Sequence, residues 1–212
     1  MSQPIVILGA GGHARVVADL CRCLGREVAG FLDPAQATDA QVGAARVIGA
    51  DDRLEDPAFV AAHEFALGVG DPTVRCRLGR AVAAVGGALP ALVHPAACVA
   101  ADAALGRGAV LLAGAIVNCG SRIGDHAILN TGSTLDHDGE LGEGTQLGPG
   151  AHLGGDVRTG ARVRIGIGAS VIQGIRIGED AVVGAGSAVI RDVAAGETVV
   201  GCPARPVGSG TA

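Results

Sequence analysis

The chain has 212 residues, a formal net charge of −5 and 36 glycines, with three phenylalanines and neither tryptophan nor tyrosine. We expect no nucleic-acid partner, because such proteins usually present a basic surface and often stack bases on aromatic rings. No apolar run approaches the length of a membrane span and the N-terminus lacks a basic leader, so we expect neither membrane association nor a signal peptide.

The six cysteines, at positions 21, 23, 76, 98, 119 and 202, are scattered without C-x-x-C spacing. Scattered cysteines of this kind usually serve as small buried side chains of a protein in a reducing compartment. A disulfide framework or a zinc site would show closer, regular spacing. This pattern predicts a cytoplasmic protein.

Residues 1–90 are predicted to form one domain in which strands alternate with helices. Apolar runs predict strands at 4–9, 27–33, 64–71 and 88–93, and helices are expected after a glycine turn within 9–25 and over 72–86. This alternation favours a small parallel α/β sheet of the Rossmann type.

The glycine turn carries a nucleotide-binding pattern. Gly9, Gly11 and Ala14 match the G-x-G-x-x-A form of the dinucleotide fingerprint, and Asp33 follows at about the right distance to meet a ribose hydroxyl. The pattern predicts a phosphate at the start of the helix, where free N–H groups favour anions. Because a domain of about 90 residues is only half of the fold that a dinucleotide usually spans, a mononucleotide diphosphate fits better than NAD.

Residues 91–212 are predicted to form a second domain, dominated by a six-residue repeat. Stepping by six from Val93 to Ala195 meets eighteen positions, of which sixteen are valine, isoleucine or leucine. A small residue usually stands four positions after each, and glycine often follows the aliphatic residue directly. The period predicts a parallel β-helix with the aliphatic residue inside, the small residue near the corner and glycine tolerating the turn. Three units per coil would give about six coils, stacked about 4.8 Å apart.

One repeat unit, LDHDGE over residues 135–140, carries unusual polar residues. Leu135 is expected to fill the core and Gly139 the small position, which leaves His137 and Asp138 on the outward part of the coil. Imidazole has a pKa suited to general-base catalysis near neutral pH, and a neighbouring carboxylate can fix its tautomer. Because one coil is eighteen residues long, Gly155 should stack against His137.

The chain resembles a known family along nearly its whole length. The matching segments are GAGGHARVV, FLD, GVGD, ILNTGSTLDHD, VIQGIRIG, VVGAGSAVIRD and GCPARPV. They are similar to bacterial sugar-nucleotide N-acetyltransferases, hexapeptide-repeat enzymes that acetylate UDP-4-amino sugars or GDP-perosamine. The resemblance implies a left-handed β-helix, a homotrimer, acetyl-CoA as cosubstrate without a metal, and a nucleotide-linked amino sugar as substrate.

The resemblance also implies roles for individual residues. His137 would be the general base for direct attack of the sugar amine on the thioester, with Asp138 raising its basicity. An N–H group of Gly154 or Gly155 is hypothesised to meet the thioester oxygen. The implied contacts with the sugar nucleotide are Gly11, Gly12, His13, Asp33 and Gly70, with Asn130 near the reacting groups. Those with coenzyme A are Gly155, Ile167, Ala185 and Gln146, where the family often has a histidine.

Several alternatives remain open. Outward polar residues of solenoids are often only solvated, and Asn130 could serve a left-handed corner. His13, Asp33 and Gly70 could serve only the helix start, a strand end and a turn. Pro34 stands where some relatives carry an acidic residue, which leaves the nucleobase open. The alternative functions are O-acetylation of a sialic acid, a nicotinamide oxidoreductase and a non-catalytic scaffold.

A zinc site is not expected. His126, His137 and His152 are the candidate ligands by number, but they occupy three different positions within their repeat units. Coordination needs ligands that converge on one point.

Overall fold

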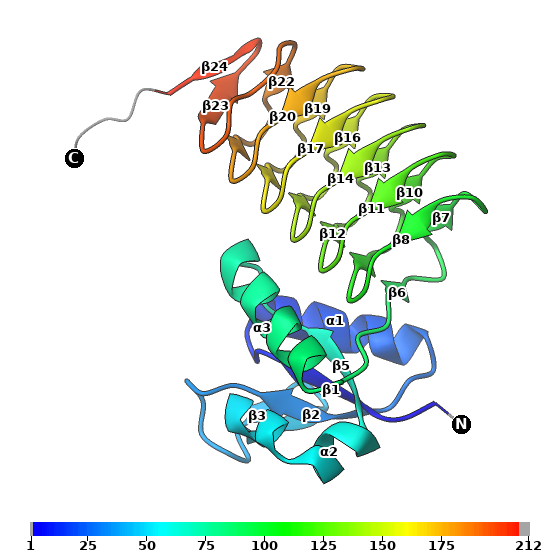
Figure 1. Cartoon of the computed structure of the whole chain (residues 1–212), viewed down its shortest axis with the longest axis vertical. Coiled ribbons are helices and arrows are strands. Elements are labelled where there is room, and N and C mark those ends of the chain that lie inside the picture. Colours follow the sequence, from blue (N-terminus) through cyan, green and yellow to red (C-terminus); the bar gives the residue numbers. More distant parts are fainter. Residues whose placement is uncertain (1, 208–212) are drawn as a thin grey trace. The chain divides into compact units, whose positions relative to one another are not determined.

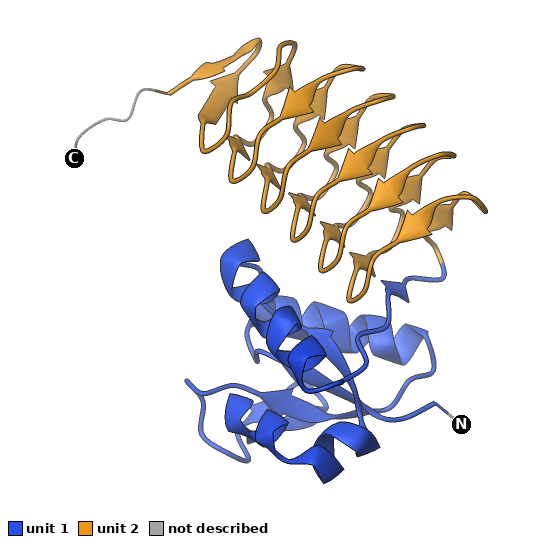
Figure 2. Cartoon of the chain, in the orientation of Figure 1, with its two compact units in different colours: residues 1–95 blue, residues 96–212 orange. Residues whose placement is uncertain are grey.

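The computed structural model describes residues 2–207. The chain divides into two compact units, residues 1–95 and 96–212 (Figure 2). Among the described residues, no helix is both long enough and apolar enough to cross a bilayer.

The first unit is built on a five-stranded sheet of order β3-β4-β2-β1-β5 (Figure 1). Strand β1 pairs in parallel with β2 and β5, β2 pairs in parallel with β4, and the edge strand β3 is antiparallel to β4. The strands are β1 Ile5–Leu8, β2 Val28–Leu32, β3 Gln41–Val42, β4 Ala45–Gly49 and β5 Glu64–Leu67. Every residue of β1 is buried, as a continuous apolar run predicts for a central parallel strand.

The two long helices expected from the sequence are confirmed. The helices are α1 Gly12–Cys23, the 3₁₀ helix η1 Asp51–Glu55, α2 Pro57–Ala62 and α3 Pro72–Ala84. Helix α1 packs against β1, and α3 packs against β5. The side chain of Asp71 caps α3 by accepting the Val74 N–H at 3.0 Å, and Asp56 caps α2 in the same way. Within residues 2–207, no side chain caps the start of α1.

The sequence predicts no element over residues 34–63, yet they contain β3, β4, η1 and α2, which are too short to show a clear period. One expectation for this unit was wrong. Residues 88–93 do not form a strand of this sheet: Ala88 makes one isolated bridge to Glu64, and β6 (Leu92–Val93) is not among its five strands. Pro90 lies between them and has no N–H with which to extend the pairing.

The second unit is a parallel β-helix whose coils stack into three sheets, or faces (Figure 1). Pairing partners are eighteen residues apart, as when Ile116 pairs with Thr134 and Thr134 with His152. The first face holds β7 Cys98–Val99, β10 Ile116–Val117, β13 Thr134–Leu135, β16 His152–Leu153, β19 Ser170–Val171 and β22 Ala188–Val189. The second face holds β8 Ala104–Leu105, β11 Arg122–Ile123, β14 Glu140–Leu141, β17 Arg158–Thr159 and β20 Arg176–Ile177. The third face includes β9 Val110–Leu111, β12 Ile128–Leu129, β15 Gln146–Leu147, β18 Arg164–Ile165, β21 Val182–Val183, β23 Thr198–Gly201 and β24 Ala204–Pro206.

Each position of the repeat has a distinct physical task. The inward residue of the repeat is the second residue of its strand. It is buried at each position from Leu111 to Val189, as with Leu135 and Leu147, each 0% exposed, whereas Val99 and Leu105 of the first coil are half-buried. Burying such a side chain stabilises the folded state by about 1.5–3 kcal/mol, and each coil buries up to three of them. Three positions later the backbone turns with positive φ, at every sixth residue from Gly108 to Gly186.

The glycine that directly follows the aliphatic residue has a different task from the one expected. Gly142 is not among the residues with positive φ, and a Cβ placed on it would lie well inside contact distance of the Gly160 carbonyl on the next coil. Glycine is needed there because adjacent coils approach closely, whereas the left-handed turn falls two positions later.

The repeat shortens at its C-terminal end. Ile177 and Val183 pair with Val193 and Val199, sixteen residues on, so Ala195 does not continue the inward column. The chain then closes with the antiparallel hairpin of β23 and β24.

All six cysteines are free thiols, but the expectation that they are buried holds only in part. Cys98, Cys119 and Cys202 are exposed. Cys98 is the first residue of a two-residue strand, where the side chain points outward, and Cys119 lies at a corner.

Candidate functional site

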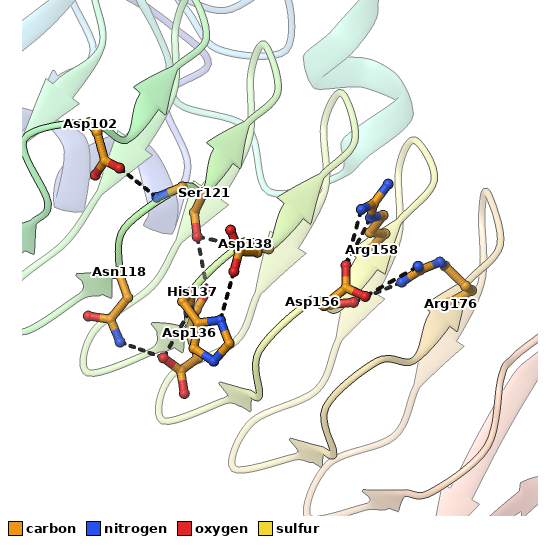
Figure 3. Close-up of polar contacts among 11 residues, drawn as sticks. Asp102, Asn118, Ser121, Asp136, His137, Asp138, Asp156, Arg158 and Arg176 are labelled. Atoms are coloured by element: carbon orange, nitrogen blue, oxygen red, sulfur yellow. Dashed lines mark hydrogen bonds and ion pairs between the residues drawn. The ribbon is translucent and has the colours of Figure 1, made fainter.

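The unusual repeat unit forms a hydrogen-bonded pair at a corner of the solenoid. His137 Nδ1 lies 2.9 Å from Asp138 Oδ2, and the two side chains are 57% and 67% exposed (Figure 3). The hydrogen bond that the imidazole donates to Asp138 raises the pKa of His137, and the negative charge of Asp136 adds to this effect. With Nδ1 engaged, Nε2 is the ring nitrogen left to exchange a proton with a ligand.

Asp138 occupies the left-handed position of its repeat, with φ 59°, where most other coils have glycine. Its N–H donates to the Cys119 carbonyl of the preceding coil at 2.9 Å. Directly across, a Cβ placed on Gly120 would come within 2.5 Å of Asp138 Oδ1. Gly120 therefore leaves the space in which the carboxylate sits, and its own N–H is bound by Asp102 at 3.0 Å.

Gly155 of the following coil stacks against His137, as the eighteen-residue spacing predicts. A Cβ placed on Gly155 would lie 2.5 Å from both Cε1 and Nε2 of the imidazole. The neighbouring Gly154 N–H donates to the Val171 carbonyl at 2.9 Å, whereas the Gly155 N–H donates to no group among the described residues. Of the two N–H groups considered from the sequence, only that of Gly155 is available to a ligand.

Sequence reasoning missed the residues that hold the turn itself. Asp136 is an outward carboxylate for which the sequence assigns no role, but its Oδ1 accepts a hydrogen bond from the His137 N–H at 2.8 Å and from Asn118 Nδ2 at 2.7 Å (Figure 3). Ser121 Oγ donates to the Asp136 carbonyl at 2.9 Å and accepts the Gly139 N–H at 3.2 Å. The spacing of eighteen between Asn118 and Asp136 was the available signal, because residues that far apart stack on adjacent coils.

The other predicted residues of the solenoid lie elsewhere on it. Ile167 and Ala185 share a different corner on adjacent coils, where the Gly186 N–H donates to the Ile167 carbonyl at 2.8 Å. Ile167 is 63% exposed, which is unusual for isoleucine. Gln146 is the first residue of β15 on the third face. Asn130 Oδ1 accepts the Thr131 N–H at 2.9 Å, and its φ is not positive, so the left-handed alternative for Asn130 was wrong.

In the first unit, the predicted glycine turn is open. Gly11 is the N-cap of α1, the first turn has no acidic residue, and a Cβ on Gly11 or Gly12 would meet nothing within 4 Å. Such an uncapped helix start offers N–H groups and the positive end of the helix dipole to an anion. Gly9 has φ 97°, and a Cβ there would lie 2.7 Å from Val69, so the tight turn requires glycine.

Asp33, at the end of β2, is bound to the chain. Its Oδ2 accepts the Ala10 N–H at 2.8 Å, and its Oδ1 accepts the Ala35 N–H at 2.9 Å. The carboxylate therefore shapes the glycine turn directly, in addition to any role toward a ribose hydroxyl.

His13 and Gly70 are linked through a buried arginine. Arg75 is 1% exposed and donates to the carbonyls of Val69 and Gly70 at 3.1 and 2.6 Å. Burial lowers the pKa of His13 to about 4, with a further contribution from the charge of Arg75. The buried Nε2 of His13 has no hydrogen-bond partner among the described residues, so a neutral imidazole stands in the first turn of the helix that follows the glycine turn.

Two hollows lined by described residues bear on the predicted sites. A groove of about 400 Å³ runs over the first face of the solenoid and is lined by Asn118, Asp136, His152 and Gly154 among others. A cavity of about 660 Å³ in the first unit is lined by residues of α1 and the β3–β4 turn, and none of the predicted sugar-nucleotide residues lines it.

The three histidines considered as zinc ligands occupy three different positions of the repeat unit in the structure. His126 is 2% exposed at a left-handed turn, His137 lies at the corner and His152 begins β16, where its Nδ1 is 3.0 Å from Thr134 Oγ1. Within residues 2–207, no group of three histidine, cysteine or acidic side chains is placed to hold a metal ion.

Both the sequence and the structure of this chain are similar to those of known proteins. Residues 4–82 match the family of PglD N-terminal domains. The acetyltransferase domain of PglB from Neisseria gonorrhoeae, solved with acetyl coenzyme A, is 37% identical, with a TM-score of 0.92 over 98% of this chain and 100% of that one. PerB from Caulobacter crescentus, solved with CoA and GDP-perosamine, is 39% identical, with a TM-score of 0.91 over 97% of both chains.

A histidine-to-alanine mutant of GDP-perosamine N-acetyltransferase from Caulobacter crescentus is 38% identical, with a TM-score of 0.92 over 97% of both chains. No match was found among curated protein sequences. The chain belongs to the sugar-nucleotide N-acetyltransferase family.

Membership of the sugar-nucleotide N-acetyltransferase family confirms the fold class expected from the sequence, a Rossmann-like sheet followed by a left-handed parallel β-helix. It also identifies the protein as an acetyltransferase, in preference to an oxidoreductase or a scaffold.

Proposed function

We propose that the protein transfers the acetyl group of acetyl-CoA to the amino group of a nucleotide-linked amino sugar, of the UDP-4-amino-sugar or GDP-perosamine type. The observation that carries the proposal is the exposed His137–Asp138 pair with the unused N–H of Gly155 beside it. This arrangement offers a base, a group that orients the base, and a donor for an oxyanion within one corner of the solenoid.

In the proposed reaction the sugar amine is in its neutral form, and His137 Nε2 removes one N–H proton as the amine nitrogen attacks the thioester carbonyl carbon. Asp138 accepts a hydrogen bond from Nδ1–H, which leaves the Nε2 lone pair available, and its negative charge stabilises the imidazolium that forms. The tetrahedral intermediate collapses by breaking the carbon–sulfur bond. The imidazolium then returns the proton to the departing thiolate, so the products are the N-acetyl sugar nucleotide and free coenzyme A.

The Gly155 N–H is proposed to donate to the thioester oxygen as it gains negative charge. A main-chain donor of this kind is fixed by the fold and needs no rearrangement during the reaction, and removing one such donor typically costs 10²–10³-fold in kcat. The peptide that carries the Gly155 N–H lies between two peptides that the next coil holds. The Gly154 N–H donates to the Val171 carbonyl at 2.9 Å, and the Gly174 N–H donates to the Gly155 carbonyl at 2.8 Å.

The remaining assignments follow the family resemblance. Gly11, Gly12, His13, Asp33 and Gly70 are proposed to bind the sugar nucleotide, supported by the uncapped, unobstructed start of α1. Asn130 is proposed to lie near the reacting groups. The proposed contacts with coenzyme A are Gly155, Gln146, Ile167 and Ala185, supported for Ile167 by its apolar exposure. A homotrimer is the proposed assembly, in agreement with the resemblance.

The experiment that tests the proposed function is product analysis by mass spectrometry. The protein is incubated with acetyl-CoA and, in separate reactions, with UDP-linked and GDP-linked 4-amino sugars. We expect one acetyl group to be added to the amine of one class. Acetylation of a sialic acid hydroxyl, with none of the amino sugars modified, would replace this proposal by O-acetylation.

A further inference from the structure

We infer that Asn118 and Asp136 form a positioning pair that fixes the main chain of His137 and reserves its imidazole for Asp138. This inference rests on the proposed function of His137 as the general base. Neither Asn118 nor Asp136 is assigned to a step of the reaction, and their contacts are with the turn rather than with the ring (Figure 3).

The geometry of the pair spans two coils. Asn118 stands eighteen residues before Asp136, directly across on the preceding coil, and its Nδ2 donates to Asp136 Oδ1 at 2.7 Å. The same oxygen accepts the His137 N–H at 2.8 Å. A carboxylate oxygen has two lone pairs, so both acceptor positions of Oδ1 are occupied.

The rest of the turn is held from the same side. Ser121 bridges the Asp136 carbonyl and the Gly139 N–H, at 2.9 and 3.2 Å. From the other side, the Asp156 N–H donates to the His137 carbonyl at 2.9 Å. The N–H and the carbonyl of His137 are thus both engaged, and the direction of its Cα–Cβ bond is set before any ligand arrives.

The second carboxylate near the ring is also tied to other groups. Asp156 lies on the following coil and is paired with Arg158 at 3.1 Å and with Arg176 at 3.5 Å. The Arg176 guanidinium also donates to the Asp156 carbonyl at 2.8 Å. Arg158 and Arg176 thus place two cations beside this group of carboxylates.

Three carboxylates therefore surround the imidazole, and only one bonds to it. Asp136 is held by Asn118, Asp156 is held by its arginines, and Asp138 is left to accept from Nδ1. If Asp136 were released, its carboxylate could compete for a ring nitrogen and either rotate the ring or block Nε2. The pair thus acts on catalysis through the orientation of His137, and all three negative charges raise the pKa of the imidazole.

The test combines four variants with steady-state kinetics and a pH profile. Asp136→Asn keeps an acceptor oxygen at the same place but removes the charge. We expect its kcat at high pH to stay within about threefold of wild type, while the acid limb of the kcat profile moves to lower pH because a negative charge near the imidazole is lost.

The variants that break the pair should lose more. Asp136→Ala and Asn118→Ala are each expected to lower kcat by at least about tenfold with KM for both substrates nearly unchanged, since a misplaced base affects the chemical step. The double variant should be no slower than Asp136→Ala alone, because both changes remove one shared contact. The control is Arg122→Ala, which breaks another eighteen-residue pair, Arg122–Glu140 at 3.3 Å on the second face, and should leave kcat unchanged.

Three outcomes would overturn the inference. They are wild-type kcat in Asn118→Ala, fully multiplicative losses in the double variant, and a rise in the sugar-nucleotide KM without a change in kcat. The last outcome would mean that the pair contacts substrate from the groove and does not position His137.

An NMR titration of the imidazole keeps this inference separate from the proposed function. The His137 signal is assigned by its loss in His137→Ala, and the titration needs no substrate. The pKa of His137 should fall in Asp136→Asn, whereas an unchanged pKa would contradict the arrangement. If wild type acetylates no substrate, the proposed function fails, while the titration still decides the placement of Asp136.

Discussion

The substitution Gly155→Ala should disable the base without removing it. The added Cβ would lie 2.5 Å from Cε1 and Nε2 of His137, about 0.9 Å inside the 3.4 Å at which ordinary contact begins. The ring must therefore move by about that distance, and a misplacement of about 1 Å at a reacting group can cost about 10²-fold in rate. Gly155 has no positive φ, so alanine adds no backbone strain and the fold should persist.

The assay is the steady-state rate of thiol release from acetyl-CoA with saturating sugar nucleotide. We expect kcat to fall about 10²-fold, with a thermal midpoint close to that of wild type. The matched control is Gly150→Ala, where a Cβ meets nothing within 4 Å but φ is 63°, so the change costs about 1–2 kcal/mol of stability and leaves kcat within about twofold. Wild-type kcat in Gly155→Ala, together with inactivity of His137→Ala, would refute the stacking of the imidazole on this glycine.

Three further predictions follow from the pKa values and the buried arginine. In wild type, kcat/KM should fall as pH drops through a midpoint above 6.5, because His137 has a raised pKa and becomes protonated at a higher pH than a free imidazole. Asp138→Asn should move this midpoint to lower pH and lower the value of kcat/KM at high pH, and an unchanged midpoint would contradict the His137–Asp138 pair. His13 has a pKa of about 4 in the folded chain and an ordinary pKa of 6.5, so the free energy of unfolding of the first unit should fall by about 3 kcal/mol between pH 6.5 and pH 4, as measured by denaturant titration. His13→Gln should lack this fall, and the same dependence of stability on pH in both proteins would contradict the burial of His13. Arg75→Met should raise KM for the sugar nucleotide but not for acetyl-CoA, because the Gly70 carbonyl loses its donor at 2.6 Å; equal changes in both KM values would show a general loss of structure.

Much of the fold is predictable because its signals are local or periodic. One six-residue register predicts the inward column up to Val189, and the two-residue strands follow it. The register cannot show that the last coil shortens to sixteen residues, since Ala195 still fits the pattern while Val193 makes the bridge. Likewise, β4 and α2 depend on packing against β2 and the core, which a short apolar run does not reveal.

The candidate site is predictable where chemistry is concentrated in neighbouring residues. His137 and Asp138 are adjacent in sequence, and the coil length places Gly155 beside them. The roles of Asn118 and Asp136 depend on a hydrogen bond between coils. Their spacing of eighteen residues places them on adjacent coils but does not show that their side chains bond. The choice between the Gly154 and Gly155 N–H groups also needed the structure, because it depends on which peptide the next coil already binds.

The most direct test of the central claim compares thiol release from acetyl-CoA by wild type and His137→Ala, with a panel of UDP-linked and GDP-linked 4-amino sugars. The account predicts turnover of one substrate by wild type and a loss of about 10²–10⁴-fold in kcat for the variant, as for removal of a general base. Turnover that survives in His137→Ala at the wild-type rate would contradict the assignment of the base.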